Sequence, residues 1–386
     1  MSLILFWTAI GSLIYVFAAF TAIIIVRGRF FPKPFVQEDI TPSISIIIAA
    51  YNEEENIAAK IENSLTLDYP PDKLEIIIGS DGSTDRTAEI VQQFSDPRIH
   101  FFDLPRMGKN GVLNTIVPNA TGEILVFSDA NSIYAANAIR ALARGFSDPH
   151  IGGVAGNQTY LPSEEVNCIK GQGERVYWNF DQTLKEYLSR AGNINSATGA
   201  MYAIRSSLFC PISKGTDDFI ISTGIIAQGY RLIYAPDAIS YEPVAASSSS
   251  EYKRKVRNIM LGLEAVLVRR QLLNPFKHGF YALQLFTHKV LRRFVFVPLL
   301  VLLITSLFLW NQGLLYQLTA IAQLAFYGLA LLGFSIEKTK LGHSKIVSIP
   351  LFVTMVYTAS LVATFNLIRG RRIHKWETQR QTSTNR

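Results

Sequence analysis

Three short polar segments of this chain hold the residues best suited to chemistry. Residues 81–85 (DGSTD) closely follow the apolar run 74–79, residues 128–131 (SDAN) follow the run 124–127, and residues 216–219 (TDDF) come further along. In an open parallel sheet, ligands bind beyond the carboxyl ends of the strands. Carboxylates gathered there suit a divalent cation bound to a diphosphate, because hard cations take oxygen ligands.

The composition places the chain between soluble and membrane proteins. Of its 386 residues, 49% are hydrophobic and 17% are charged, and the mean hydropathy is +0.20. One soluble domain of about 200 residues with a few membrane helices fits this balance. The net charge of +7 is concentrated beside the apolar runs, which is typical of cytoplasmic loops and anionic lipid headgroups. We therefore expect membrane lipids, and no nucleic acid, among its partners.

Apolar runs at both ends predict membrane helices. Residues 3–26 carry no charge and are long enough for the roughly 30 Å hydrocarbon core, without the features of a cleaved signal. Three further spans are predicted at about residues 294–310, 314–334 and 347–368. Residues 251–273 combine basic residues with apolar residues at helical spacing, which predicts an amphipathic helix in the membrane interface. The alternative is a basic helix on a soluble surface.

The strand and helix signals predict an α/β domain. Residues 45–50, 74–79, 98–102 and 123–127 have the pattern of short buried strands. The predicted helices between them are residues 54–67 and residues 83–94, the second with Ser83 as its N-cap and Asp85 in its first turn. Alternation of this kind favours a parallel sheet that is covered on both faces. A polar hinge is expected at residues 247–250.

Five regions follow from these patterns. They are an N-terminal transmembrane helix (1–28), the α/β domain (42–245), an interfacial amphipathic region (246–290), C-terminal transmembrane helices (291–370) and a basic tail (371–386). One span before the domain and three after it would place both termini on one face, so the basic tail would break the positive-inside tendency. Either one late segment is re-entrant, or residues 280–285 belong to an additional passage.

Four motifs together resemble the nucleotide-sugar half of the family-2 inverting glycosyltransferases, which have the GT-A (Rossmann-like) fold. The motifs are AAYNE (49–53), SDGSTD (80–85), GKNGVLN (108–114) and SDAN (128–131). The TDD triplet at 216–218 and the RKVRN segment at 254–258 resemble the acceptor half of the membrane-embedded branch. That branch includes cellulose, hyaluronan and poly-N-acetylglucosamine synthases. The resemblance covers about residues 44–262 and extends to the transmembrane arrangement.

The resemblance implies a set of nucleotide-sugar contacts. Tyr51 and Glu53 would border the uracil, Asp81 would bond the base or the ribose, and Lys109 would meet the diphosphate. The implied nucleotide-sugar-binding set is Ala50, Tyr51, Asn52, Glu53, Asp81, Lys109, Asn114, Asp129 and Arg257. Two bland alternatives stand beside it: Glu53 as a residue that complements a helix dipole, and Lys109 as a solvated lysine in a glycine-flanked loop.

The resemblance also implies a metal site and a catalytic base. Asp129 would bind Mg²⁺ or Mn²⁺, and Asn131, which stands where the family usually has a second aspartate, would either ligate through its amide oxygen or only touch the ribose. Asp218 would be the general base, with Asp217 in place of the family's glutamate. Thr216 and Trp178 would contact the acceptor, although an aromatic pair such as Tyr177 and Trp178 is more often core.

These inferences leave competing functions. The leading hypothesis is an integral plasma-membrane enzyme with a cytosolic catalytic domain, which transfers a sugar from a UDP-sugar to a growing polysaccharide. The alternative is transfer of one sugar to a lipid-linked or glycolipid acceptor. The family's Gln-x-x-Arg-Trp signature is reduced here to Arg257, which favours the alternative, whereas the three later spans favour the polymerase. A non-catalytic membrane scaffold is a third possibility. The donor sugar and the linkage stay open.

Overall fold

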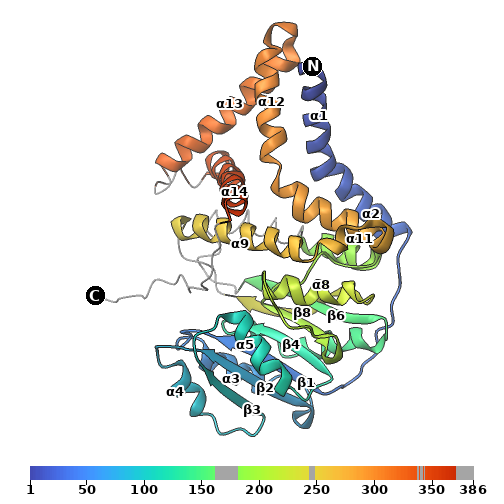
Figure 1. The fold of residues 1–386 in the computed structure, drawn as a ribbon, viewed down its shortest axis with the longest axis vertical. Coiled ribbons are helices and arrows are strands. Elements are labelled where there is room, and N and C mark those ends of the chain that lie inside the picture. The colour runs from blue at the N-terminus through green and yellow to red at the C-terminus, as the bar shows by residue number, and fades with distance from the viewer. Residues whose placement is uncertain (161–180, 243–247, 337–338, 340–341, 343, 371–386) are drawn as a thin grey trace.

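The structure is a computed structural model that describes the chain apart from residues 161–180, 243–247, 337–338, 340–341, 343 and 371–386. It has two parts, a sheet domain and a set of long helices, with α9 lying between them (Figure 1). The chain passes from the first helices into the sheet domain and returns to the helical part after β8.

An eight-stranded mixed sheet forms the centre of the lower part, in the order β3-β2-β1-β4-β7-β6-β8-β5. Its first half is parallel, and it pairs Ile46 of β1 with Ile76 of β2, and Ala49 of β1 with Asp129 of β4. The strands of this half are β1 (Ile44–Ala50), β2 (Leu74–Asp81), β3 (Ile99–Leu104) and β4 (Ile124–Asp129). The predicted α/β GT-A fold and its first four strands are therefore confirmed.

The second half of the sheet changes direction. Here β7 runs antiparallel to both β4 and β6, and β5 runs antiparallel to β8, while β6 and β8 are parallel. The strands are β5 (Ile133–Tyr134), β6 (Ile151–Tyr160), β7 (Met201–Arg205) and β8 (Arg231–Glu242). The parallel sheet predicted from the first four strands is therefore confirmed for them, whereas the antiparallel strands of the second half were not predicted. Strand direction depends on pairing between distant segments and not on the apolar pattern within one segment.

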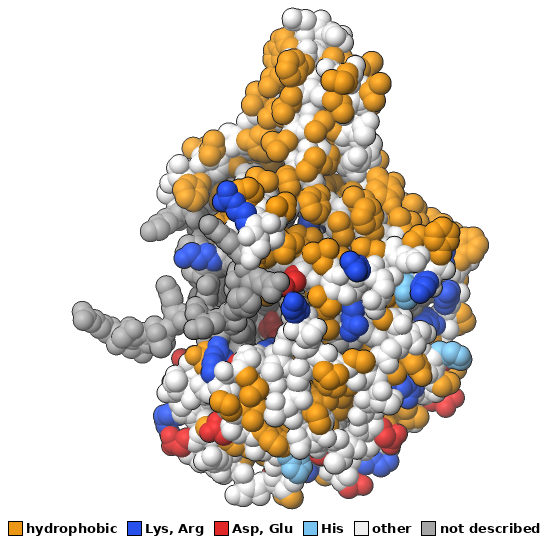
Figure 2. Space-filling model, in the orientation of Figure 1, with side chains coloured by type: hydrophobic (Ala, Val, Ile, Leu, Met, Phe, Trp, Pro, Cys, Tyr) orange, Lys and Arg blue, Asp and Glu red, His pale blue; other side chains and the backbone are white. Residues whose placement is uncertain are grey.

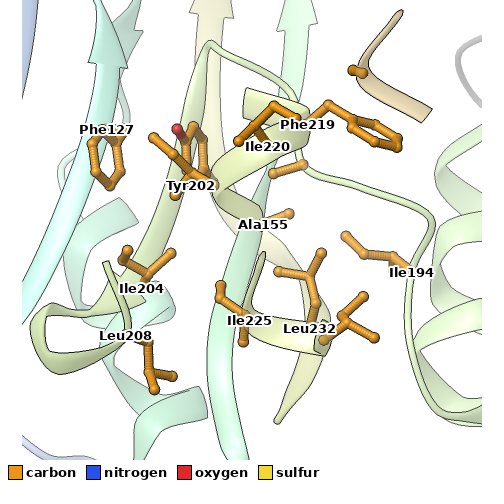
Figure 3. Close-up of a cluster of buried hydrophobic side chains, with 14 of the residues drawn as sticks. Phe127, Ala155, Ile194, Tyr202, Ile204, Leu208, Phe219, Ile220, Ile225 and Leu232 are labelled. Atoms are coloured by element: carbon orange, nitrogen blue, oxygen red, sulfur yellow. The ribbon is translucent and has the colours of Figure 1, made fainter. Parts of the chain in front are cut away.

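Both faces of the sheet are covered, as predicted. Ile46 and Ile48 of β1 face a core that includes residues of α3 (Ile57–Leu65) and α6 (Ala138–Arg144). Ile47 and Ala49 face the opposite core, which α5 (Lys109–Ile116) and α8 (Asp217–Ala227) complete. Figure 3 shows Phe219, Ile220 and Ile225 of α8 over the strands of this second core. The alternation follows from the two-residue period of a strand.

Some helix starts differ from the prediction. Helix α4 spans Thr87–Gln92, not 83–94, and the Asp85 carboxylate accepts a hydrogen bond from the Thr87 N–H at 3.0 Å. The Ser83 hydroxyl instead meets Asn52 and Ser80, so the predicted N-cap was wrong. Short 3-10 turns connect other elements: Pro71–Lys73, Val117–Asn119, Gly145–Ser147, Ser206–Leu208, Arg270–Leu273, Leu291–Arg293 and Trp310–Gln312.

The described helices include three that are long and apolar enough to cross a membrane. They are Ser2–Phe30, Leu314–Ser335 (α13) and Lys345–Ile368 (α14). The first consists of α1 (Ser2–Ile14), a π-helical turn (Tyr15–Ala19) and α2 (Phe20–Phe30). Helix α12 (Phe296–Phe308) forms a pair with Phe280–Arg293 that is bent by 56°, which is a broken fourth span or a re-entrant loop.

Helix α9 (Ser248–Val268) packs mainly against protein. Val256 and Met260 are buried against Ala359 and Ala363 of α14. Leu263 is also buried, whereas Leu267 is 59% exposed. Most of the apolar stripe predicted to lie in lipid is therefore covered by α14 and the catalytic domain. Ser248–Ser250 begin this helix, so the polar hinge expected there is helical in its described part.

A core substitution tests this arrangement. Ile47 is fully buried in the central strand, so Ile47→Ala should lower the free energy of unfolding by about 2–5 kcal/mol through lost burial and a residual cavity. The measurement is thermal unfolding of the detergent-purified protein. Val36→Ala, at a position that is 51% exposed, is the control and should leave the midpoint nearly unchanged. Equal midpoints for the two variants would contradict the assigned core.

Candidate active site

The carboxyl ends of β1, β2 and β4 lie near the start of α8. A lysine joins the end of β4 to the start of α8. Lys109, the first residue of α5, places its Nζ 2.7 Å from Oδ1 of Asp129 and 3.0 Å from Oδ2 of Asp217. Its side chain is 17% exposed. The alternative of a solvated loop lysine is therefore not what the structure has: Lys109 is a helix-start residue that bridges two acidic segments separated by almost ninety residues of chain. Its predicted contact with the diphosphate stays a prediction.

Charge and burial shape the ionisation of this cluster. Burial lowers the pKa of Lys109, but the carboxylates of Asp129 and Asp217 overcome this effect and raise the pKa above its ordinary value. The charged ammonium form is therefore favoured. Burial, with repulsion from Asp217, raises the pKa of Asp218 to about 6, although the charges of Lys109 and Lys289 and a hydrogen bond from Thr216 oppose the shift. A carboxylate with this pKa is suited to accepting a proton near neutral pH.

A second cluster lies at the end of β2. The fully buried Asp81 accepts hydrogen bonds from the N–H groups of Met107 (2.7 Å) and Gly108 (2.8 Å) and pairs with the Arg106 guanidinium. The same guanidinium lies 3.4 Å from the centroid of the Tyr51 ring. Arg106 thus brings together Tyr51, predicted to border the uracil, and Asp81, predicted to bond the base or the ribose. Arg106 was missed, although its position three residues before Lys109 was a usable signal.

The loop after β1 is fastened to the loop after β2. The Asn52 side chain, at φ 51°, accepts from the Thr84 N–H at 2.8 Å. The Glu53 N–H donates to the Thr87 hydroxyl at 2.8 Å, and the buried Glu53 carboxylate accepts from the side-chain amide of Asn56, the N-cap residue of α3. The loop that carries Ala50 and Tyr51 is therefore held by side chains, which restricts its position before any ligand binds.

Helix α5 also fixes the chain that leads into α8. The Asn114 amide accepts from the Ile212 N–H at 2.8 Å and donates to the Ile212 carbonyl at 2.9 Å. Asn110 donates to the Gly215 carbonyl at 3.0 Å. In this structure the Asn114 side chain holds the backbone of the segment before Asp217 through these two hydrogen bonds. Its predicted contact with the nucleotide-sugar stays a prediction.

Two buried residues beneath the carboxylates were not anticipated. The Lys60 ammonium donates to the Ser132 carbonyl at 2.7 Å and so supports the turn after Asp129. Burial lowers the pKa of Lys60 to about 7, against the attraction of Asp129. The Tyr202 ring stacks on Phe127 at 4.9 Å, and its buried hydroxyl has no hydrogen-bond partner within the described residues. Their sequence surroundings are those of ordinary core positions, so no local signal marked them.

The remaining predicted site residues differ in exposure and in their distance along the chain from the acidic cluster. Asp129 is 34% exposed and Asn131 is partly exposed two residues later. The described residues contain no group of three or more His, Cys, Asp or Glu side chains that could hold a metal. Thr216 caps the start of α8, and Arg257 is half-buried on α9. Trp178 lies outside the described residues.

Arg269, the first residue after α9, contacts helix α8. The Arg269 guanidinium donates to the carbonyl of Ile220 in α8 at 2.9 Å. A Cβ on Gly224 would lie 2.7 Å from the guanidinium nitrogen, so glycine makes room for it. The start of α8 is held at a second point, because the Gly215 backbone (φ 92°) packs closely against Ala265. Arg269, expected among the basic residues at the membrane interface, instead joins the end of α9 to α8.

The mixed sheet with a polar edge at β1, β2 and β4 has the architecture of the GT-A fold. The structure is similar to a mannosyltransferase from Pyrobaculum calidifontis that was solved in complex with GDP-Man and Mn²⁺. The match has a TM-score of 0.70 and 22% sequence identity, and it covers 95% of this chain and 100% of the other. At this identity the likeness establishes the shared fold.

Sequence comparison matches part of the chain to a known family. Residues 45–210, a little under half of the chain, match the model of glycosyl transferase family 2. Poly-beta-1,6-N-acetyl-D-glucosamine synthase of Staphylococcus aureus (strain COL) is 29% identical over 244 residues, which are 61% of this chain and 58% of that protein. The enzyme of the same name from Staphylococcus epidermidis is 27% identical over 275 residues, with coverages of 68% and 63%. The chain thus spans about three-fifths of the length of these relatives.

The contact between α9 and α8 can be tested by substitution. Arg269→Ala should lower kcat for sugar transfer several-fold with little change in the KM for donor, because it loosens the helix that carries Asp218 without touching the nucleotide loops. Arg270→Ala, at the exposed neighbouring position, is the control and should retain kcat. Arg269→Lys should restore part of the activity, since it keeps one donor. If Arg269→Ala and Arg270→Ala behave alike, this contact does not position the base.

Proposed function

We propose that this protein is a membrane-integrated inverting glycosyltransferase that transfers a sugar from a UDP-sugar to a growing polysaccharide. The observation that carries the proposal is the position of Lys109 between Asp129 and Asp217, beside Asp218, at the carboxyl edge of a GT-A sheet. The arrangement offers a cation for a diphosphate and a carboxylate of raised pKa for a proton.

In the proposed reaction, Asp218 acts as the base. Its carboxylate accepts the proton of the acceptor hydroxyl while that oxygen bonds to the anomeric carbon, and the bond from this carbon to the diphosphate oxygen breaks. One displacement of this kind inverts the anomeric configuration, and UDP leaves with the bonding electrons. Lys109 lies where its ammonium can attract the departing diphosphate, and Arg257 is proposed to add a second cation from α9.

The donor set suits a hard divalent cation. Asp129, Asp217, Asp218 and Lys109 carry a formal charge of −2 together when the three acids are ionised, and a diphosphate adds further negative charge. Asp129 and the amide oxygen of Asn131 would hold Mg²⁺ or Mn²⁺ with oxygen atoms of the diphosphate. When bound, the ion neutralises charge on the leaving group.

The proposal also assigns the two sides of the pocket and the membrane anchor. Ala50, Tyr51, Asn52, Glu53 and Asp81 would form the uridine side of the pocket in a cytosolic domain spanning residues 42–245. Thr216 and Trp178 are proposed on the acceptor side. The helices before and after the domain would anchor it in the plasma membrane, with residues 246–290 at the interface.

A polysaccharide product is supported by the relatives that share the domain, which are named for polymer synthesis. UDP-N-acetylglucosamine is therefore the first donor to test. The full chain in lipid nanodiscs should convert labelled donor into products that grow in length with time, measured by gel filtration and mass spectrometry. Products that never exceed one added sugar on a lipid would assign the alternative reaction, and failure to release UDP from any of several UDP-sugars would reject the proposal.

The base assignment predicts the effect of one substitution. Asp218→Asn keeps the size of the side chain but removes the proton acceptor, so kcat should fall by about 10²–10⁴-fold while UDP affinity is retained. Asp237→Asn, an exposed position on β8, is the matched control. The measurements are UDP release and calorimetric UDP binding. A loss below about tenfold would transfer the role to another residue, and a parallel loss of UDP affinity would make Asp218 structural.

The raised pKa of Asp218 predicts a pH dependence. Its folded pKa of about 6 lies above the ordinary aspartate value, so the reactive ionised form is lost as the pH falls through 6. The kcat should therefore be near its plateau at pH 7.5 and decline about tenfold for each pH unit well below 6. The profile of kcat against pH measures this effect. A flat profile between pH 5 and 7.5 would show that the ionisation of Asp218 does not limit transfer.

Metal dependence follows from the Asp129 assignment. Asp129→Ala should lose most turnover, because it removes the charged oxygen ligand, and EDTA should silence the unmodified protein until Mg²⁺ or Mn²⁺ is restored. Asp72→Ala, at an exposed position, is the control and should retain turnover. Asp148 is less suitable, because its carboxylate accepts hydrogen bonds from the N–H groups of Val36 and His150. Full turnover of Asp129→Ala in either metal would remove Asp129 from the site.

A further inference from the structure

A second cavity, of about 450 Å³, lies where α2 ends, β8 begins and the chain turns from α10 (Pro275–His278) into α11 (Phe280–Leu285). Its lining includes the basic side chains of Arg27, Lys33, Arg231 and Lys277, with His278 beside them. Among the described residues that line it there is no aspartate or glutamate. The cavity therefore has the charge of an anion site.

The arginines of this cavity differ in what they contact. Arg231 donates to the carbonyls of Lys33, Pro34, Ser189 and Gly192, so its guanidinium serves to hold the backbone. Arg27 lies over the Phe280 ring at 4.6 Å, and its buried Nε has no hydrogen-bond partner within the described residues. The Arg27 side chain is partly exposed and, within the part of the chain that the structure describes, is not bound to backbone carbonyls as Arg231 is. Its exposed part can therefore meet an anionic oxygen in the cavity.

The surroundings of the cavity are those of a membrane boundary. Arg27 is in the last turn of the candidate span Ser2–Phe30, and Phe280 begins the bent pair that contains α12. Three phenyl rings nearby in the chain are exposed: Phe30 (70%), Phe31 (69%) and Phe276 (98%). Figure 2 shows Lys and Arg side chains gathered below the hydrophobic upper part of the molecule. Cations next to exposed apolar rings match an amphipathic anion better than a free ion.

We propose that this cavity binds the phosphate of an anionic phospholipid headgroup, with Arg27 and Lys277 as its principal cations and with the acyl chains against the exposed phenyl rings. The site is separate from the transferase centre. It includes Ile226, Gly229 and Tyr230 at and beyond the carboxyl end of α8, whereas Asp217 and Asp218 are at the amino end of that helix.

The test compares two arginines on one helix. Arg27 lines the cavity, whereas Arg29 is exposed and does not line it. The full chain in neutral detergent is titrated with short-chain phosphatidylglycerol, and binding is measured by microscale thermophoresis. Arg27→Ala should weaken binding about tenfold or more, since a charge-assisted hydrogen bond is lost, whereas Arg29→Ala should stay within about twofold. General attraction of basic residues to anionic lipid would weaken both alike, and that result would overturn the proposal.

Further arms define the ligand and guard against misfolding. Lys277 is exposed on α10, so Lys277→Ala provides a second variant that should also weaken binding. Zwitterionic phosphatidylcholine should bind at least about tenfold more weakly than phosphatidylglycerol, because its headgroup has no net charge. Inorganic phosphate should not compete at equal concentration. Full competition by phosphate, or equal binding of the two lipids, would reject an anionic phospholipid as the ligand.

Discussion

The ion pairs of Lys109 are the interaction on which the site depends. Asp129 and Asp217 arrive from β4 and from the start of α8, and two carboxylates brought to one edge repel each other unless a cation lies between them. The same helix that supplies this cation also supplies Asn110 and Asn114, which hold the segment before Asp217. Helix α5 therefore sets both the charge balance of the site and the position of the helix that follows.

Helix α8 contacts the sheet core on one side and the helical part of the molecule on the other, and it carries Asp218. Its apolar residues Phe219, Ile220 and Ile225 pack into the sheet core (Figure 3), which places Asp218 where burial raises its pKa. The carbonyl of Ile220, one turn into α8, accepts the hydrogen bond from Arg269, which directly follows α9. Because α9 packs on α14 through Val256 and Met260, a series of contacts leads from a membrane-length helix to the helix that carries Asp218. Close-packed interiors transmit strain, so this connection couples the position of Asp218 to the helical part.

Basic residues inside the protein and at its membrane-facing boundary have different contacts. Arg231 and Arg269 satisfy backbone carbonyls inside the protein, whereas Arg29 and Lys277 are exposed at the boundary. A guanidinium offers five donors in a fixed geometry, and an ammonium offers three. Only the surrounding fold decides whether carbonyls or solvent meet those donors.

The sequence by itself determined the strands β1 to β4, the covering of both sheet faces and the acidic segments at the strand ends, because these depend on local apolar periodicity and on short motifs. Tertiary structure decided the antiparallel direction of β7, the pairing of Lys109 with Asp129 and Asp217, and the burial of the α9 stripe against α14. It also decided that Arg106 lies between Tyr51 and Asp81. Each of these contacts joins residues that are tens or hundreds of positions apart, and a local pattern specifies which face of an element is apolar but not which distant element will cover it.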